Sequence, residues 1–349
     1  MKIIVTGNMG YIGPIVVRQL KKTYAGAQII GLDAGFFAHC LTNAPVLPES
    51  LVDLQYFQDV RNVTPDIFQG ADALVHLAAI SNDPIGNKFE KVTADINYES
   101  SVRIAKLAKQ AGVGRFVFAS SCSIYGAAAN GGCTEDAPLN PLTAYARSKV
   151  ATEQALQKLA DEEFIVTCHR FATACGMSER LRLDLVLNDF VACALSSGEI
   201  SVLSDGTPWR PLIHVEDMAR AIDWAIQREI SRGNYFLAVN TGSNSWNYQI
   251  KDLAQAVAMV MPDIKVSINK NAQPDKRSYR VNFDLFEELA PFHQPLHNLH
   301  TAINGLKSGL EAIKFNDKDF RNSNYIRLKV LNDLVSSRIL DSNLFMVRN

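Results

Sequence analysis

The stretch KIIVTGNMGYIG, residues 2–13, leads from a short apolar segment directly into a glycine-rich turn. Glycine at positions 7, 10 and 13 permits a tight turn, close approach of the backbone to a pyrophosphate and close helix–strand packing. Asp33 ends the next apolar run, about 20 residues further on, where a carboxylate can bind ribose hydroxyls. This pattern predicts a dinucleotide site at the start of a helix, and the simpler alternative is a tight turn followed by a solvated aspartate.

Apolar runs alternate with helix-length segments through the first half of the chain. The runs lie at residues 2–6, 28–32, 73–78, 115–120 and 164–171, and amphipathic stretches lie at 96–112 and 143–163. This alternation predicts an α/β fold, a Rossmann-type doubly wound parallel sheet. We expect residues 1–175 to form the dinucleotide-binding domain. Residues 176–349 are expected to form a smaller, mainly substrate-binding α/β lobe, with some segments returning to the sheet.

Composition narrows the choice of partners and location. The 349 residues include 35 basic and 36 acidic side chains with no basic block, which disfavours nucleic acid as a partner. No apolar run is long enough to cross a membrane, and the glycine turn comes too early to leave room for a leader peptide. Six cysteines without a C-x-x-C pair suit reduced thiols. We therefore expect a cytoplasmic protein.

The residues after Asp33 indicate which dinucleotide binds. The segment AGFFA, residues 34–38, contains no arginine or lysine that would receive a 2′-phosphate, which favours NAD over NADP. Asp59, in FQDVRN, has the chemistry either to hydrogen-bond the adenine or to cap a helix.

Tyr145 and Lys149 lie four residues apart in an expected helix, so both side chains project from one face. A nearby ammonium group, like a positively charged nicotinamide ring, favours the phenolate of a tyrosine and lowers its pKa. Tyr145 is therefore a candidate general base near neutral pH. The alternative is a surface pair without a catalytic role. The small polar cluster SSCSIYG, residues 120–126, ends the preceding strand.

These pieces together resemble the extended short-chain dehydrogenase/reductases, the family of NAD-dependent nucleotide-sugar epimerases and dehydratases. The matching motifs are TGNMGYIG, Asp33, HLAA at 76–79, SSCSIYG, YARSK and RPLIHVEDMA at 210–219. The resemblance implies that Tyr145 is the base, that Lys149 anchors the nicotinamide ribose and that Ser121 hydrogen-bonds the reacting sugar hydroxyl. It also implies a nucleotide-diphosphate sugar as substrate and a homodimer formed by the helices near 96–112 and 145–162.

The site residues expected from this resemblance fall into two groups. Those expected to bind the cofactor are Gly7, Asn8, Met9, Gly10, Tyr11, Ile12, Gly13, Asp33, Asp59, Val60, Leu77, Ala78, Ala79, Asn97, Ser120, Tyr145 and Lys149. Those expected to bind the substrate are Ser81, Ser121, Cys122, Ser123, Tyr145, Asn188, Arg210 and Arg277.

Three of the substrate-binding residues carry plainer alternatives. Arg210 matches the arginine that grips the nucleotide diphosphate in the family, and a planar guanidinium suits such a contact. Arg277 matches more loosely as a second diphosphate ligand, and Asn188 is placed to bond the pyrophosphate or the sugar. The alternatives are a surface salt bridge, a surface charge and a helix cap, respectively. Residues 170–191 are also similar to a subgroup acting on surface-polysaccharide sugars, including enzymes that oxidise C4 of a nucleotide-linked heptose.

The two residues after Ser121 narrow the choice of reaction. The 4,6-dehydratases of the family have an Asp-Glu pair there, whereas this chain has Cys122 and Ser123, so dehydration lacks its acid and base. Family members with a catalytic cysteine place it at the position of Ser123, so Cys122 is interpreted as a small buried thiol. The remaining chemistry is hydride removal, expected at C4 of the sugar.

Hydride removal leaves several outcomes open. The protein is expected to be an epimerase or a dehydrogenase, and the same chemistry run backwards is that of an NAD(P)H-dependent 4-ketoreductase. A catalytically silent dinucleotide sensor is the alternative from another class, but such proteins typically lose the tyrosine or the lysine. His293, His297 and His300 are spaced like metal ligands, but Pro295 interrupts their helix and no carboxylate falls in register, so we expect no metal.

Overall fold

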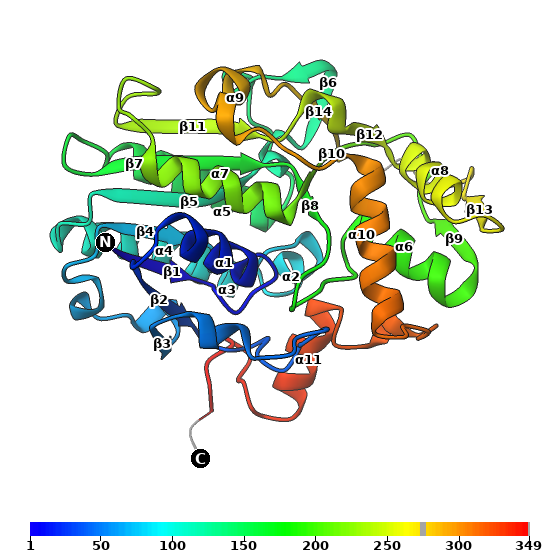
Figure 1. Cartoon of the computed structure of the whole chain (residues 1–349), viewed down its shortest axis with the longest axis horizontal. Helices are drawn as coiled ribbons and strands as arrows, with labels where there is room; N and C mark the ends of the chain where they lie inside the picture. Colours follow the sequence, from blue (N-terminus) through cyan, green and yellow to red (C-terminus); the bar gives the residue numbers. More distant parts are fainter. Residues whose placement is uncertain (273–276, 348–349) are drawn as a thin grey trace.

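The computed structural model describes residues 1–272 and 277–347, and its centre is a seven-stranded sheet in which every neighbouring pair is parallel (Figure 1). This confirms the predicted Rossmann-type fold. In spatial order the strands are β11 (Phe236–Thr241), β7 (Ile165–Phe171), β5 (Arg115–Ser121), β4 (Ala73–His76), β1 (Lys2–Thr6), β2 (Gln28–Asp33) and β3 (Leu54–Phe57). The chain winds outward in both directions from β1, so the crevice between the ends of β1 and β4 is a switch point where such folds bind ligands.

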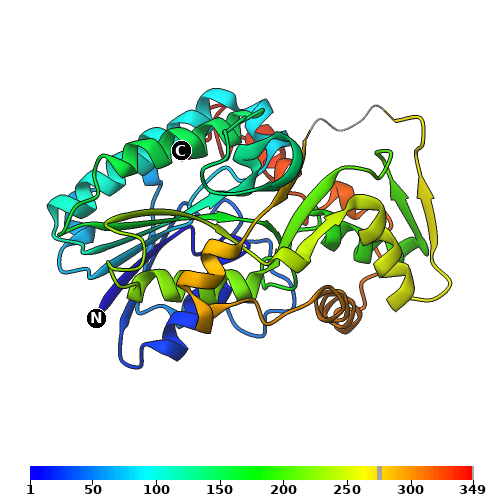
Figure 2. The same cartoon turned by 90° about the horizontal axis from the view of Figure 1, so that it is seen from above.

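Helices cover both faces of this sheet (Figure 2). One face carries α1 (Gly13–Thr23) and α7 (Val215–Gln227), and the other carries α4 (Ser100–Gln110) and α5 (Ala144–Gln157). Successive strand side chains point to opposite faces, so Ile3 packs in one hydrophobic core and Ile4 in the other. Because both faces are covered, the central strands are apolar runs rather than alternating ones.

Shorter elements join the sheet to the rest of the chain. The helix α2 (Asp83–Lys88) follows β4 and leads into α3 (Glu90–Ala94) and then a π-helical turn, Asp95–Glu99, before α4. The strands β6 (Ala127–Cys133) and β14 (Ser278–Val281) pair with each other beyond the end of β5, and α9 (Asp284–Leu289) follows β14. Of these segments, α2 and the β6–β14 pair lie at the carboxyl ends of the central strands and form a rim there (Figure 1), whereas α9 packs through Phe286 against Trp224 of α7.

The second half of the chain builds a smaller lobe beside that rim (Figure 2). Its helices are α6 (Val186–Ser197), α8 (Ile250–Val260) and α10 (Leu299–Ala312). Its strands form two small sheets, one of β8 (Thr173–Cys175), β10 (Trp209–His214) and β12 (Asn247–Gln249), and one of β9 (Glu199–Val202) and β13 (Lys265–Ile268). Between them, α7 and β11 return to the large sheet and complete its layer.

The last helix, α11 (Arg327–Ser336), does not belong to that lobe's helical layer. It lies with the chain that follows it at the β2–β3 side of the molecule (Figure 1). Leu331, Leu340 and Leu344 are buried in the same hydrophobic core as α4. Among the described residues, none of the helices has the length and apolarity needed to span a bilayer.

Candidate active site

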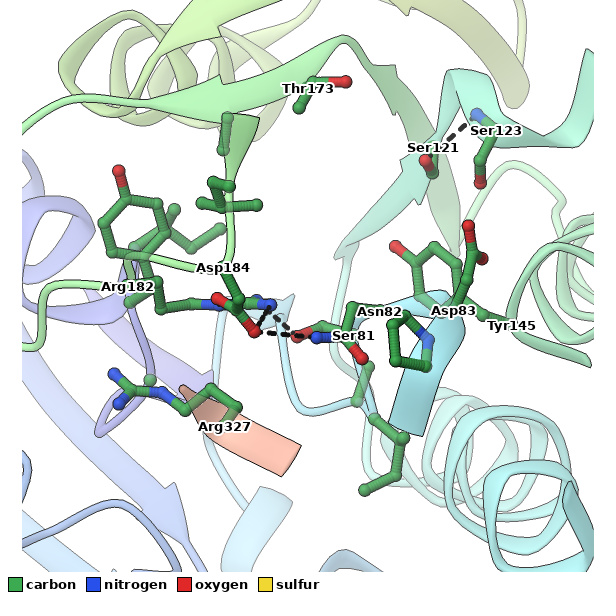
Figure 3. A pocket seen from close by; sticks show the side chains of 18 of the residues that line it. Ser81, Asn82, Asp83, Ser121, Ser123, Tyr145, Thr173, Arg182, Asp184 and Arg327 are labelled. Carbon is green, nitrogen blue, oxygen red and sulfur yellow. Dashed lines mark hydrogen bonds and ion pairs between the residues drawn. The ribbon is translucent and has the colours of Figure 1, made fainter. Parts of the chain in front are cut away.

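A cavity of about 710 Å³ opens at the carboxyl ends of the central strands, and both halves of the chain contribute to its wall. Figure 3 shows this cavity, where Ser121 at the end of β5 and Tyr145 on α5 face Arg182 and Asp184 from the second half of the chain. Its volume and its position at the switch point suit a cofactor together with a substrate.

The glycine turn is a close-packed part of this wall. Gly7 has φ +73°, and a Cβ there would lie 2.5 Å from the backbone nitrogen of Ala78. A Cβ at Gly13 would lie 2.2 Å from the carbonyl oxygen of Asn8. Both positions therefore require glycine, for the turn and for the close approach of the helix to the loop. Gly7, Gly10, Tyr11 and Ile12 line the cavity, as do Leu77, Ala78 and Ala79 opposite them.

Two other residues expected at the cofactor support the turn from behind. Asn8 is 2% exposed and its side-chain amide donates to Gln55 Oε1 at 2.7 Å. Met9 is also buried, and its backbone N–H donates to Asp33 Oδ2 at 3.1 Å. Neither of these two side chains lines the cavity, so their contribution is to the shape of the loop.

Asp33 itself lines the cavity at the end of β2. Its Oδ1 accepts from Gly35 N at 2.8 Å and its Oδ2 from Met9 N at 3.1 Å. Burial raises the pKa of Asp33, and these two backbone hydrogen bonds oppose the shift. A carboxylate held in this way keeps lone pairs for ribose hydroxyls, so the residues present fit the adenosine half of a dinucleotide.

Asp59 takes the capping role, one of the two that the sequence left open, and its contact with adenine stays a prediction. It caps the short helical turn Val60–Asn62 by accepting from Arg61 N at 2.8 Å, and it forms an ion pair with Arg61 at 2.6 Å. Both Asp59 and Val60 also line the cavity. The cap therefore orients the carboxylate without removing it from the wall.

Tyr145 and Lys149 both reach the cavity from α5. Thr143 caps this helix by accepting from Ala146 N at 3.1 Å. Lys149 is 3% exposed, its Nζ donates to Ala119 O at 2.7 Å, and its Nζ lies 5.5 Å from the centre of the Tyr145 ring. Burial lowers the pKa of Lys149 to about 7, against the opposing effect of the Glu153 carboxylate one turn later.

The pKa of Tyr145 corrects one expectation. The sequence predicted that Lys149 would lower it toward neutrality, but burial raises the pKa of Tyr145 to about 12. The nearby hydroxyl of Ser121 lowers it and the nearby carboxylate of Asp83 raises it. Burial outweighs the favourable contacts because the phenolate loses its hydration. The chain alone therefore keeps the phenol protonated at neutral pH.

The polar cluster after β5 separates into residues inside and outside the cavity. Ser120, Ser121 and Ser123 line it, and Ser121 Oγ accepts from Ser123 N at 3.1 Å (Figure 3). Cys122 points away, is 1% exposed and directs its thiol to Arg170 O at 3.0 Å. Burial raises the pKa of this thiol well above its usual value. The backbone expected from the sequence to be extended here forms instead a 3-10 turn over Cys122–Tyr125, and this turn directs the thiol to the Arg170 carbonyl rather than to the substrate side.

Two expected asparagines also lie behind the wall. Asn97 is 1% exposed and holds Ile80 by accepting from its N–H at 2.7 Å and donating to its carbonyl at 2.9 Å. Asn188 is fully buried, donates to Tyr11 Oη at 2.9 Å and accepts from Gly176 N at 3.1 Å. In each asparagine, both the oxygen and the nitrogen of the side-chain amide are bonded within the protein. The expected direct contact of Asn188 with the pyrophosphate or the sugar is therefore not supported by the structure.

Arg210 and Arg277 line the outer part of the cavity. The guanidinium of Arg210 lies 5.4 Å from the centre of the Tyr279 ring and donates to the carbonyl of Arg277. Arg277 forms an ion pair with Asp83 at 2.7 Å, and its side chain is 43% exposed. Both arginines thus contribute to the wall of the same cavity, and their binding of a diphosphate stays a prediction.

Several wall residues carry no signal that sequence reasoning could use. Arg182 binds Asp184 through two hydrogen bonds of 2.8 and 3.0 Å and donates to Ser81 at 2.8 Å, while Asn82 donates to the same Asp184 at 2.8 Å (Figure 3). Burial acts against the charge on Asp184, but Arg182 outweighs it and holds the pKa of Asp184 below its usual range. Arg182 and Asp184 were missed because ERLRLDL, residues 179–185, has no motif spacing, whereas Ser81 was expected among the substrate-binding residues and does line the cavity.

The histidine segment corrects a second expectation. His297 meets His214 and Glu216 from around the start of α7, and one ligand atom of each lies within 4.8 Å of the others. A carboxylate is therefore present, supplied by another element rather than by the segment itself. The two imidazole rings are stacked with centroids 3.8 Å apart and planes at 22°, so their in-plane lone pairs run nearly parallel instead of converging on one ion.

A dinucleotide crevice next to a tyrosine, a lysine and a serine defines an NAD-dependent oxidoreductase of the short-chain type. The chain belongs to the NAD dependent epimerase/dehydratase family, whose model matches residues 3–240. It is therefore an enzyme of this family with NAD as its cofactor, which confirms the resemblance stated from the motifs.

Relatives of known description agree with this assignment. A UDP-glucose 4-epimerase of Lactobacillus helveticus is 25% identical over 79% of this chain and 87% of its own length. A dTDP-glucose 4,6-dehydratase of Streptomyces niveus is 28% identical over 64% of this chain and 68% of its own length. Among solved structures, MoeE5 in complex with UDP-glucose and NAD has a TM-score of 0.75 at 23% identity, covering 90% of this chain and all of that one, a likeness of fold.

Proposed function

We propose that the protein removes a hydride from C4 of a nucleotide-linked sugar, with Tyr145 as general base, and acts as a nucleotide-sugar 4-epimerase or 4-dehydrogenase. The observation that carries the proposal is that Ser121 and Tyr145 lie near each other in the wall of the cavity, where the Ser121 hydroxyl acts on the Tyr145 phenol (Figure 3). A sugar hydroxyl entering there meets both oxygens, so one of them can take its proton while the other orients it.

Each side chain then has a defined task. Bound NAD supplies the acceptor for the hydride and a positive charge that favours the phenolate. Tyr145 takes the proton from the sugar hydroxyl as the C–H bond breaks, and Ser121 donates a hydrogen bond to the oxygen that becomes a carbonyl. Lys149, buried beside the Tyr145 ring, anchors the nicotinamide ribose. When Lys149 is protonated, its positive charge also stabilises the Tyr145 phenolate.

The proposed substrate is a nucleoside-diphosphate sugar whose diphosphate contacts Arg210 and Arg277. Two guanidinium groups at the cavity mouth support this, because arginine forks match phosphate oxygens. The descriptions of the relatives favour UDP as the nucleotide. The homodimer and the cytoplasmic location expected from the sequence stay predictions, and light scattering of the purified protein tests the former.

Dehydration is the less favoured outcome for a structural reason. The two positions that carry the acid and base in 4,6-dehydratases are a buried thiol, Cys122, and a hydroxyl, Ser123. The carboxylate nearest to Tyr145, Asp83, already accepts from Thr143 at 2.7 Å and pairs with Arg277 at 2.7 Å. The remaining route is oxidation, with either return of the hydride or release of the ketone as its second stage.

The test is turnover of UDP-sugars by Tyr145→Phe. We expect kcat to fall about 10²- to 10⁴-fold while NAD⁺ affinity stays at the wild-type value, because only a proton acceptor is lost. Tyr248→Phe is the matched control, since this tyrosine lies on β12 outside the cavity wall. Wild-type turnover by Tyr145→Phe with every accepted sugar would remove the proposal.

A second measurement separates the two outcomes. Denaturing the purified protein releases any retained cofactor, which chromatography identifies as NAD⁺ or NADH. A 4-epimerase is expected to interconvert C4 epimers without net reduction of NAD⁺, whereas a dehydrogenase accumulates the 4-ketone with equimolar NADH. An empty site with a preference for free NADPH would instead identify a ketoreductase.

A further inference from the structure

The C-terminal segment, residues 327–347, follows the smaller lobe in the chain and reaches the wall of the cavity with its first residue. Arg327, the first residue of α11, lines the cavity and is only 2% exposed (Figure 3). Its guanidinium lies 4.8 Å from the centre of the Phe37 ring, in the loop that follows Asp33. The segment therefore meets the cavity at the end of β2, the side where a Rossmann fold holds the adenosine half of its dinucleotide.

The charge on Arg327 differs from that of the arginines around it. Arg180 is paired with Glu49 and Arg182 with Asp184. Arg327 donates instead to two main-chain carbonyls, Asn324 O at 3.0 Å and Arg180 O at 2.7 Å, and in the described ranges it forms no carboxylate ion pair.

Such an arrangement is costly until an anion arrives. Burial lowers the pKa of Arg327 to about 10, which reflects the loss of hydration of its cation. The carboxylate of Asp184 acts in the opposite direction but forms no ion pair with Arg327, and Arg182 and Arg180 repel the charge, so an anion in the adjoining cavity would remove much of the remaining cost. Arg327 is thus suited to bind a negatively charged ligand from the cavity side.

The other end of the segment is tied to the same cavity through Arg61. This side chain donates to Asn343 O and Leu344 O, both at 2.7 Å, and its guanidinium lies 3.5 Å from the centre of the Phe345 ring. Arg61 also pairs with Asp59, which lines the cavity. The segment is therefore connected to the cofactor side of the cavity at two points. Arg327 lines the cavity itself, and Phe345 is connected to it through Arg61 and the Arg61–Asp59 ion pair.

We propose that residues 327–347 are part of the cofactor site, that Arg327 binds the diphosphate of NAD, and that the Arg61 contacts hold the segment so that NAD is released slowly. The proposal rests on the placement of NAD in this cavity under the proposed function. It assigns a role to a part of the chain that none of the family motifs covers.

The main test compares Arg327→Gln with Lys329→Gln by calorimetric titration with NAD⁺, NADP⁺ and UDP. Lys329 is the matched control, because it removes a positive charge from the same helix and pairs only with Asp333 on that helix among the described ion pairs. We expect Arg327→Gln to weaken NAD⁺ binding on the order of tenfold to a hundredfold and to leave UDP binding unchanged. Lys329→Gln should bind both ligands like wild type.

A second variant keeps the proposal testable if Arg327→Gln fails to fold. Phe345 is 37% exposed and lies outside the cavity wall, so Phe345→Ala loosens only the distal contact. Loss of this cation–π contact is expected to speed NADH release roughly two- to fivefold, measured by stopped-flow fluorescence. Release at the wild-type rate would show that the segment does not retain the cofactor.

The other outcomes are equally decisive. If Arg327→Gln binds NAD⁺ like wild type, or loses UDP affinity instead, the assignment of Arg327 is wrong although the proposed function stands. Tighter binding of NADP⁺ than of NAD⁺ by the wild type would reassign Arg327 to a 2′-phosphate. If the wild type binds neither dinucleotide, it is the proposed function that fails.

Discussion

Replacing Glu153 by glutamine is expected to affect both stability and the catalytic lysine. Glu153 lies one turn after Lys149 on α5 and is 4% exposed. Its carboxylate binds Arg170 Nη2 at 2.8 Å and Nε at 3.1 Å, and accepts from Ser120 Oγ. The sequence contained no reason to single out Glu153, because its partners Ser120 and Arg170 lie on two different elements, β5 and β7.

The expected loss results from the burial of this pair. The side chains of Arg170 and Glu153 are 8% and 5% exposed, so removing one charge leaves the other buried without its partner. Breaking a buried pair costs roughly 3–5 kcal/mol, and because glutamine keeps the shape and some of the hydrogen bonds we expect about 3 kcal/mol. Glu90→Gln is the control. The side chain of Glu90 is 68% exposed and that of its partner Arg147 is 51% exposed, so this ion pair should contribute less than about 1 kcal/mol to the free energy of unfolding.

The same change acts on Lys149. Glu153 raises the pKa of Lys149 against the effect of burial, so its removal should move that pKa further below about 7. If protonated Lys149 supports the Tyr145 phenolate, the alkaline loss of kcat in Glu153→Gln will occur at lower pH than in wild type. Urea unfolding measures the first effect and a pH–rate profile the second.

Two results would contradict this reasoning. A Glu153→Gln variant as stable as Glu90→Gln would mean that the buried pair contributes nothing, and an unchanged pH–rate profile would mean that Lys149 does not sense Glu153. A double variant, Glu153→Leu with Arg170→Met, is expected to lose less stability than Glu153→Leu alone, because no unpaired charge remains buried.

Three further predictions concern single positions. Gly7→Ala should weaken NAD⁺ binding more than tenfold by calorimetry, because its Cβ would lie 2.5 Å from Ala78 N, whereas Gly26→Ala, also at positive φ but with open space around it, should bind NAD⁺ normally. Cys122→Ala should keep wild-type turnover and lose about 1 kcal/mol of stability, and a loss of turnover would restore the thiol as a catalytic group. The third prediction compares the pH dependence of the unfolding free energy in the wild type and in Lys149→Met. Lys149 has a pKa of about 7 in the folded protein and of 10.5 in the unfolded chain, so between pH 7 and 10.5 the unfolded chain binds one proton that the folded protein does not. Wild-type stability should therefore rise with pH relative to Lys149→Met by at most about 1.4 kcal/mol per pH unit, and a fall in the same urea titration would contradict the burial of a charged lysine.

The features that sequence reasoning predicted well are local ones. The alternation of strands and helices, the glycine turn and the four-residue spacing of Tyr145 and Lys149 each depend on neighbours within about two helical turns. Backbone geometry translates such spacing directly into a face or a turn. The sequence by itself therefore determined the Rossmann fold, the place of the dinucleotide turn and the pair of side chains on α5.

Only the tertiary structure decided which distant residues share the cavity. Arg182 with Ser81, Arg277 with Asp83 and Arg327 beside Phe37 join segments far apart in the chain, and no local pattern encodes such contacts. The raised pKa of Tyr145 was likewise decided by packing, because it depends on what covers the side chain. Burial and long-range charge pairing are properties of the assembled fold, which is why the C-terminal segment gained a candidate role only when its arginine was seen in the cofactor wall.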